Sequence, residues 1–196
     1  MERALVIDNS TLIIRRAAAV VLGALVVAGA AQVSIPLPGT PVPMTLQPMA
    51  VLLVGGLLGA RLGALSMILY LAMGAAGLPV FTPTVPIYGI ARLFGPTGGY
   101  LLAYPIAAYA VGAFVPPLRT AERGSGGEDW LRAALGVVAG IVLIHLGGLA
   151  QLAIITGTIT TAAQLATWPF LLGDLLKIAV LVPVLARLTP TTRARL

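Results

Sequence analysis

Cysteine is absent from the 196-residue chain, and charged side chains are scarce. Without cysteine there are no disulfides, no thiolate nucleophile and no cysteine-ligated metal site. Charged residues make up 9% of the sequence, whereas a soluble globular protein carries about 25%. Hydrophobic residues make up 59%, which is more apolar surface than a core of this size can remove from water. Lipid is therefore the expected solvent for most of the chain.

Motifs that carry chemistry in enzymes are missing as well. The chain has no G-x-x-x-x-G-K-[ST] phosphate loop, no G-x-S-x-G nucleophile turn and no paired catalytic carboxylates. Its one histidine, His145, cannot make a metal site. The net charge of +6 comes from basic residues scattered at the ends of apolar runs, unlike the clustered basic face of a nucleic-acid-binding protein. We therefore expect no enzyme activity, cofactor, metal ion or nucleic-acid partner.

What the chain does contain is a series of long apolar segments. A helix needs about 20 mostly apolar residues to cross a bilayer, and shorter apolar helices can stop inside a bundle beside a cavity. The sequence thus predicts an all-α, polytopic protein of the cytoplasmic membrane, with six transmembrane helices in one domain (12–188) between tails at 1–11 and 189–196. The segments are 12–33, 46–60, 62–77, about 100–116, 130–156 and 166–188, with a threonine-rich turn at 158–164.

Loops and basic residues predict the orientation of these helices. Four prolines make residues 34–45 a stiff loop, 78–95 is a second irregular segment, and 118–129 is a glycine-rich, flexible loop. Cytoplasmic loops carry an excess of Lys and Arg. With both termini cytoplasmic, loops 34–45 and 78–95 are external, loop 118–129 is cytoplasmic, and only Arg92 and Lys177 depart from the rule. The basic residues then placed inside are Arg3, Arg15, Arg16, Arg61, Arg119, Arg123, Arg132, Arg187, Arg193 and Arg195.

Asp174 and Lys177 are an acid and a base within the last apolar segment. Their spacing of three puts both on one face of a helix. A charge at membrane depth costs roughly 2.5–3.5 kcal/mol on insertion scales. One interpretation is a structural ion pair; the other is a binding site for a polar solute, with Arg92 folding over a cavity whose floor holds the pair. The acid can accept from N–H groups, and the two cations can donate to carbonyl or carboxylate oxygens.

Five other polar residues were also weighed as candidates. Gln47 begins the second segment just below the first loop and is expected to contact a solute there. Tyr88 and Tyr100 are candidate solute contacts or interface anchors. His145 and Gln151 in the fifth segment are expected to form bonds between helices instead of binding a ligand.

Four stretches of sequence carry a family resemblance. They are IPLPGTPVPMTLQ (35–47), GLPVF (77–81), GPTGGY (95–100) and GDxxK (173–177). Together they resemble the BioY family, the biotin-specific substrate-binding (S) components of energy-coupling factor (ECF) transporters. The likeness runs from the first loop to the last segment and leaves out the tails and the glycine-rich loop. One departure is the run 82–88, where the family usually has a glycine-rich stretch, so the detailed shape of that side of the pocket does not carry over.

The resemblance implies a six-helix S component that binds biotin with high affinity from outside the cell for import. It maps the family's functional aspartate, lysine and arginine onto Asp174, Lys177 and Arg92, and it makes loop 36–45, which ends at Thr45, a lid over the vitamin. Uptake in the family is commonly driven by a transmembrane coupling subunit and two ATPases, although some members occur without them. Biotin has two ureido N–H donors, a carbonyl and a valerate carboxylate, and the sequence leaves open which cation takes which end.

Three alternatives stay open at this stage. The chain could be a biotin transporter or channel that acts without partners, an S component for another vitamin, or a structural membrane subunit whose Asp174–Lys177 pair only holds helices together. A homo-oligomer is also open.

Overall fold

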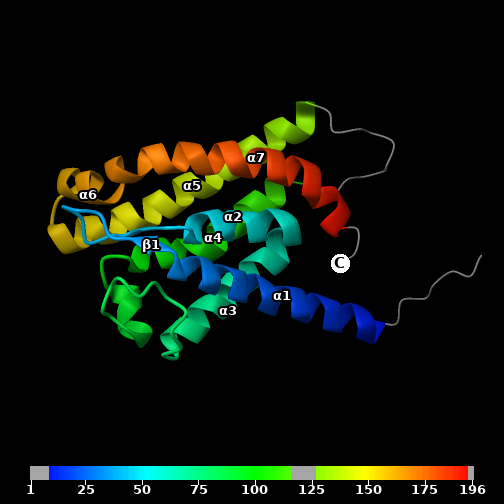
Figure 1. Ribbon diagram of the computed structural model, residues 1–196, viewed down its shortest axis with the longest axis horizontal. Coiled ribbons are helices and arrows are strands. Elements are labelled where there is room, and N and C mark those ends of the chain that lie inside the picture. Colours follow the sequence, from blue (N-terminus) through cyan, green and yellow to red (C-terminus); the bar gives the residue numbers. More distant parts are fainter. Residues whose placement is uncertain (1–8, 116–126, 194–196) are drawn as a thin grey trace, which may run out of the picture.

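The computed structural model describes residues 9–115 and 127–193. These residues form a helical bundle with one small hairpin (Figure 1). In chain order the elements are α1 (Asn9–Gln32), β1 (Ser34–Ile35), β2 (Met44–Thr45), α2 (Gln47–Leu58), α3 (Ala60–Ala75), η1 (Gly89–Phe94), α4 (Gly98–Phe114), α5 (Gly127–Thr156), α6 (Ile159–Ala166), η2 (Trp168–Phe170) and α7 (Leu171–Arg193), where η1 and η2 are 3₁₀ turns. The prediction of a mostly helical fold is confirmed for the described residues.

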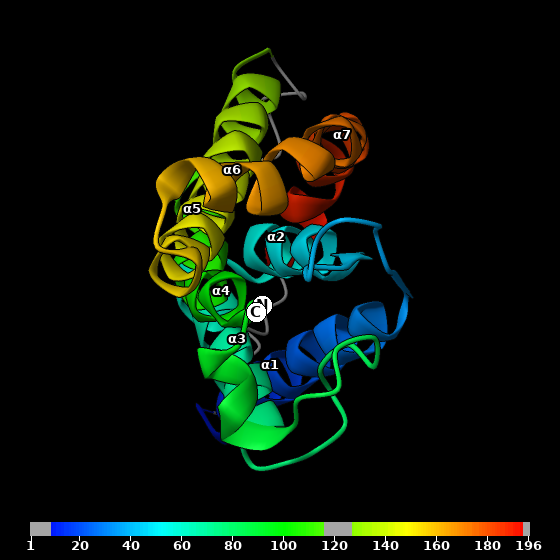
Figure 2. The same cartoon turned by 90° about the vertical axis from the view of Figure 1, so that its left-hand side faces the viewer.

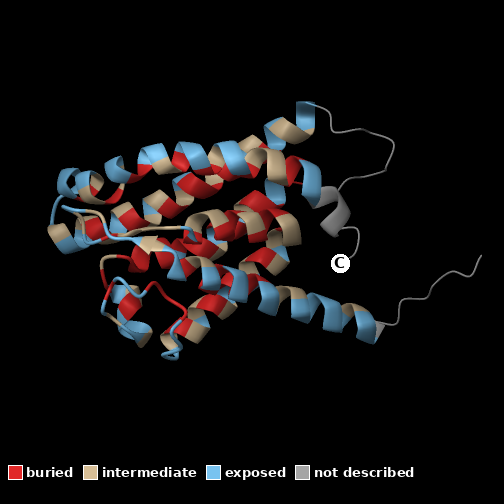
Figure 3. Cartoon of the chain, viewed as in Figure 1, coloured by how far each residue is buried: buried red, intermediate tan, exposed pale blue. Residues whose placement is uncertain are grey.

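The outside of the bundle is apolar. Ile13, Leu22, Ile154 and Leu172 are more than half exposed, and Figure 3 shows exposed residues along the outer faces of α1 and α7. Among the described residues, three stretches are long and apolar enough to cross a membrane: α1, α5 and the run Ile159–Leu188. The helices α2, α3 and α4 are shorter but apolar. Exposed apolar surface of this extent indicates contact with lipid, so the chain is a multi-pass membrane protein.

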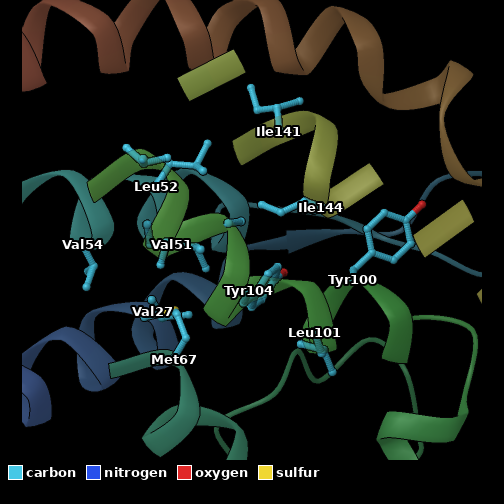
Figure 4. Packing of buried hydrophobic residues seen from close by; sticks show 14 of the residues in the cluster. Val27, Val51, Leu52, Val54, Met67, Tyr100, Leu101, Tyr104, Ile141 and Ile144 are labelled. Carbon is cyan, nitrogen blue, oxygen red and sulfur yellow. The ribbon is translucent and has the colours of Figure 1, made fainter. Parts of the chain in front are cut away.

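Small residues bring the helices into close contact. Gly99 of α4 faces Gly147 of α5, and a Cβ atom on either would collide with the carbonyl oxygen of the other. Gly112 of α4 lies equally close to the backbone of Ala60 at the start of α3. In lipid, no hydrophobic effect drives helices together. Close approach of their backbones gains van der Waals contacts, and these stabilise the helix pairs instead. The remaining space is filled by apolar side chains from α1 to α5, shown in Figure 4.

The proline-rich loop 34–45 folds as a hairpin. β1 and β2 pair in antiparallel fashion, with Ser34 opposite Thr45. The Thr40 hydroxyl donates to the carbonyl of Leu165, at the end of α6, at 2.7 Å. Figures 1 and 2 show the hairpin at the same end of the bundle as η1, α6 and the start of α7, whereas the start of α1 and the end of α7 lie at the opposite end.

A predicted turn is in fact a helix. Residues 158–164 were expected as a threonine-rich turn, but residues 159–166 form α6, a short α-helix in addition to the segments predicted as transmembrane. α6 buries Ala162 and Ala166, which lie one helical turn apart, and it packs against α5. The weak helix propensity of threonine concealed this spacing. Gly157, with a φ of +77°, makes the bend between α5 and α6, a conformation that glycine adopts without steric cost.

Other segment limits also differ from those predicted. The last helix begins at Leu171, because residues 168–170, which include Pro169, form the 3₁₀ turn η2. It continues to Arg193, through most of the predicted tail. α5 begins at Gly127, within the predicted loop 118–129, and the rest of that loop, up to residue 126, lies outside the described residues.

Candidate substrate-binding site

The acid of α7 has two basic partners. Lys177 Nζ donates to Asp174 Oδ1 at 2.8 Å, as their spacing on one helix face predicts. From α5, His145 Nε2 lies 2.6 Å from Asp174 Oδ2. Asp174 and Lys177 are both buried. Because α7 begins at Leu171, Asp174 sits in the first turn of its helix instead of nine residues along a longer one.

A cavity lies beside this ion pair. Its wall comes from the hairpin, α2, the loop before α4, and α4, α5 and α7, and its volume is about 50 Å³, which is room for a few water molecules. Apolar side chains of α4 and α5 supply much of the wall, among them Leu101, Tyr104, Ile141 and Ile144 (Figure 4). A purely structural ion pair needs no cavity next to it, so this arrangement favours a binding role. The predicted residues that line it are Thr45, Gln47, Arg92, Tyr100, Asp174 and Lys177.

Arg92 reaches the cavity from η1 and is 1% exposed. Its guanidinium donates to backbone carbonyls: Nη1 to Val85 and Ile87, the latter at 3.2 Å, and Nη2 to Thr82 at 3.1 Å. Nε is buried and has no hydrogen-bond partner within the described chain. Burial lowers the pKa of the Arg92 guanidinium, because desolvation penalises the charged form, yet the group stays cationic in proteins.

The site therefore carries excess positive charge. Asp174 and Lys177 neutralise each other, and no salt bridge among the described residues reaches Arg92. A buried cation held only by carbonyl dipoles is costly without a counter-charge. A ligand with a carboxylate would supply that charge.

Gln47 and Thr45 form a hydrogen-bonded edge of the cavity below the hairpin. Gln47 Nε2 donates to the Tyr70 hydroxyl at 2.5 Å, and that hydroxyl donates to the Val80 carbonyl at 3.2 Å. Thr45 Oγ1 lies 3.3 Å from Gln47 Oε1, within donating distance. The chain of bonds fixes Gln47, which is buried, at the start of α2.

The two candidate tyrosines lie in different places. Tyr100 lines the cavity, and its hydroxyl donates to the carbonyl of Ala166 at the end of α6. Tyr88 does not line the cavity and is 72% exposed just before η1. The structure thus brings Tyr100, but not Tyr88, to the other site residues.

Sequence reasoning did not assign four polar residues of the cavity wall to the site, namely Thr82, Thr97, Tyr104 and His145. His145 was expected to bond another helix, which it does, but it also lines the cavity. Thr97, in the GPTGGY motif, lines the cavity with a buried hydroxyl that has no partner in the described part of the chain. Gln151 does not line the cavity; its partners are not another long helix but the carbonyls of Leu93 in η1 and of Gly95, to which it donates. The GPTGGY motif could have identified Thr97 as a candidate. The position of His145 opposite Asp174, in contrast, depends on how α5 and α7 pack.

These features define a class of protein: a multi-pass membrane protein whose helices enclose a small cavity at one end of the bundle, with a largely apolar wall that also carries an acid and two cations. The chain belongs to the BioY family, whose sequence profile matches residues 3–194. It is 38% identical over 152 residues to the "Probable biotin transporter BioY" of Pyrococcus horikoshii, covering 78% of this chain and 83% of that protein. It is 36% identical over 165 residues to the "Biotin transporter BioY" of Thermotoga maritima, covering 84% of this chain and 89% of that protein.

The fold also matches a solved structure. That structure is described as the crystal structure of "the S-component for biotin from an ECF-type ABC transporter". The TM-score is 0.76 at 24% sequence identity, and the match covers 92% of this chain and 93% of the other. The family resemblance predicted from the four sequence stretches is thus confirmed.

Proposed function

We propose that this chain is a substrate-binding membrane component that captures biotin from outside the cell for its import, and that it is not an enzyme. The observation that carries the proposal is the cavity itself, in which an acid–base pair and an uncompensated arginine face the same space. The membership of the BioY family and the names of its relatives support biotin as the solute.

The hydrogen-bonding groups suggest how biotin lies in the cavity. An ionised carboxylate has about four lone-pair sites, and two of those of Asp174 are taken by His145 and Lys177. The others can accept the ureido N–H groups, while Lys177 has further N–H donors for the ureido carbonyl. Arg92 Nε and the Thr97 hydroxyl, both without partners among the described residues, suit the valerate carboxylate. Arg92 is therefore assigned to the carboxylate end and Lys177 to the ureido end.

A ligand must pass the wall of the cavity to enter it. Most of the residues that line the cavity are buried, so part of the wall has to move aside. The hairpin forms part of this wall, and Thr40 links its tip to α6. We therefore propose that the hairpin loop is the lid and that the Thr40–Leu165 hydrogen bond holds this lid closed.

Replacing Thr40 with valine should make biotin leave faster. Valine keeps the shape of threonine but removes the 2.7 Å bond to the Leu165 carbonyl, together with the 3.1 Å bond that Thr40 Oγ1 accepts from the Val42 N–H within the hairpin. A hydrogen bond of this kind contributes about 0.5–1.5 kcal/mol. We expect dissociation of labelled biotin to accelerate roughly 2- to 10-fold. The matched control is Thr160→Val on the exposed face of α6, which should leave the rate unchanged. Equal biotin dissociation rates for both variants and the parent would show that Thr40 does not hold the lid closed.

Binding of biotin should raise the unfolding temperature of the purified chain. A ligand that binds only the folded state stabilises it by RT ln(1 + [L]/Kd), about 2.7 kcal/mol at 100 times Kd. Thiamine and riboflavin at the same concentration should give no shift, because neither presents a cyclic urea together with a carboxylate. A shift with thiamine or riboflavin but not biotin would instead support an S component for another vitamin.

The proposed arrangement in the cell membrane has six membrane crossings and cytoplasmic termini. The positions of the hairpin, η1 and α6 at one end of the bundle, opposite the start of α1, support it (Figure 1). The chain has no cysteine, so single cysteines can report accessibility without background. Ser34→Cys should react with a membrane-impermeant maleimide on intact cells, whereas Ser10→Cys should react only after permeabilisation. The reverse pattern would invert the topology.

Import is proposed to require a transmembrane ECF coupling subunit and two ATPases, since the chain itself has no phosphate loop. The fold match to an S component of an ECF-type transporter supports this. Liposomes that contain the purified chain alone should bind biotin at their surface without accumulating it. Uptake by the chain alone would favour the alternative of a self-sufficient transporter or channel.

A further inference from the structure

His145 is the only histidine of the chain, and it lies where α5 meets the first turn of α7. Its side chain is 15% exposed. The ring packs between those of Tyr100 and Phe170, with centroid distances of 6.2 and 6.4 Å, and its Nε2 lies 2.6 Å from Asp174 Oδ2. The two aromatic neighbours and the short polar contact together restrict how the ring can turn.

The contact with Asp174 fixes which ring nitrogen carries the proton. An ionised carboxylate can only accept, so Nε2 must be the donor. Nδ1 is buried and has no partner in the part of the chain that the structure describes. A proton on Nδ1 would be a buried donor without an acceptor, which is costly, so the neutral Nε2–H tautomer is favoured. His145 is then an uncharged donor to Asp174, and Lys177 alone neutralises the carboxylate.

Among the residues that the structure describes, His145 alone ties the carboxylate to another helix. Lys177 lies one turn along the same helix as Asp174, so it moves with α7 and cannot fix the carboxylate relative to the opposite cavity wall. His145 belongs to α5, which also contributes Ile141 and Ile144 to the cavity. The side chain thus sets the position of Asp174 within the cavity as a whole.

We propose that His145 is a positioning residue of the binding site, which holds the Asp174 carboxylate so that its remaining lone pairs face the N–H donors of a cyclic urea. This inference rests on the proposed function and deepens it, because it assigns to α5 a part in selecting the ligand. The residue acts through Asp174 and need not touch the ligand itself.

Two variants separate this role from simple packing. His145→Phe keeps a ring between Tyr100 and Phe170 but removes the donor, and it should weaken biotin binding roughly 10- to 100-fold, as the loss of a hydrogen bond to a charged group does. His145→Gln loses the ring but retains an amide N–H donor, and its biotin affinity should stay within a few-fold of the parent. Both affinities are to be measured by calorimetry on protein whose unfolding temperature is recorded in parallel.

A measurement without ligand completes the test. In protein labelled with ¹⁵N-histidine and carrying no histidine tag, the single histidine should show a protonated Nε2 and a bare Nδ1, and Asp174→Asn should shift its signals. The proposal is overturned if His145→Phe binds biotin as tightly as the parent, if glutamine does not restore binding, or if Asp174→Asn leaves the signals unchanged. A parent chain that binds no biotin but shows the expected histidine signals would instead remove the proposed function.

Discussion

Asp174→Asn should lower the affinity for biotin more than any other single conservative change. Asparagine keeps the shape of the side chain, but it turns one acceptor into an NH₂ donor that opposes the ureido N–H groups. It also leaves Lys177 without its neutralising partner. Removing one partner of a buried charge pair in a binding site costs about 2–5 kcal/mol, or roughly 30- to several-thousand-fold in Kd. Equilibrium dialysis with labelled biotin would measure the loss.

A charge swap provides the control for this change. Asp174→Lys combined with Lys177→Asp keeps an ion pair at the same spacing on α7, but it reverses the direction in which acceptor and donor meet the ligand. If the pair serves binding, the swapped chain should fold, as judged by its unfolding temperature, and still fail to retain biotin. Biotin retained by both the asparagine variant and the swapped chain would mean that the pair only holds helices together.

Arg92→Met should produce the second large effect, and the effect should depend on the carboxylate of the ligand. Methionine fills part of the same volume but removes the positive charge and the free Nε donor. A hydrogen bond to a charged group contributes about 1.5–3 kcal/mol, so biotin affinity should fall roughly 10- to 150-fold. Biotinamide, which lacks the carboxylate, should bind the parent more weakly than biotin does and should bind Arg92→Met about as well as it binds the parent.

The comparison of the two ligands separates the charge of Arg92 from its structural role. The guanidinium also satisfies the carbonyls of Thr82, Val85 and Ile87, so its removal is expected to lower the unfolding temperature. Arg92→Lys keeps the charge with fewer donors, and it should recover part of the preference for biotin over biotinamide. If Arg92→Met weakens both ligands equally, the arginine supports the loop and does not read the carboxylate.

Much of this architecture could be read from the sequence because lipid imposes simple rules. Apolar runs without charge must be helices, since every backbone polar group needs an internal partner. Asp174 and Lys177 are conspicuous as charges within such a run, and Arg92 as a basic residue in a loop predicted to be external. The structure brings all three to one cavity. The proline-rich loop could be predicted equally well, because proline excludes a helix and leaves the chain extended.

What escaped prediction depends on how helices meet. His145 gains its role only because α5 places it opposite Asp174 across a helix interface, a relation with no counterpart in sequence spacing. α6 was missed because its helix is stabilised by packing Ala162 and Ala166 against α5, which outweighs the poor propensity of its threonines. From the sequence, Tyr88 was as good a candidate for a solute contact as Tyr100, but its side chain, just before η1, is exposed on the surface.

Two hydroxyl groups from different parts of the cavity wall donate hydrogen bonds to the end of α6. Neighbouring carbonyls, those of Leu165 and Ala166, accept from Thr40 of the hairpin and from Tyr100 of α4. A movement of the hairpin that breaks the Thr40 bond therefore acts on the same end of α6 that holds the Tyr100 side chain in the cavity wall.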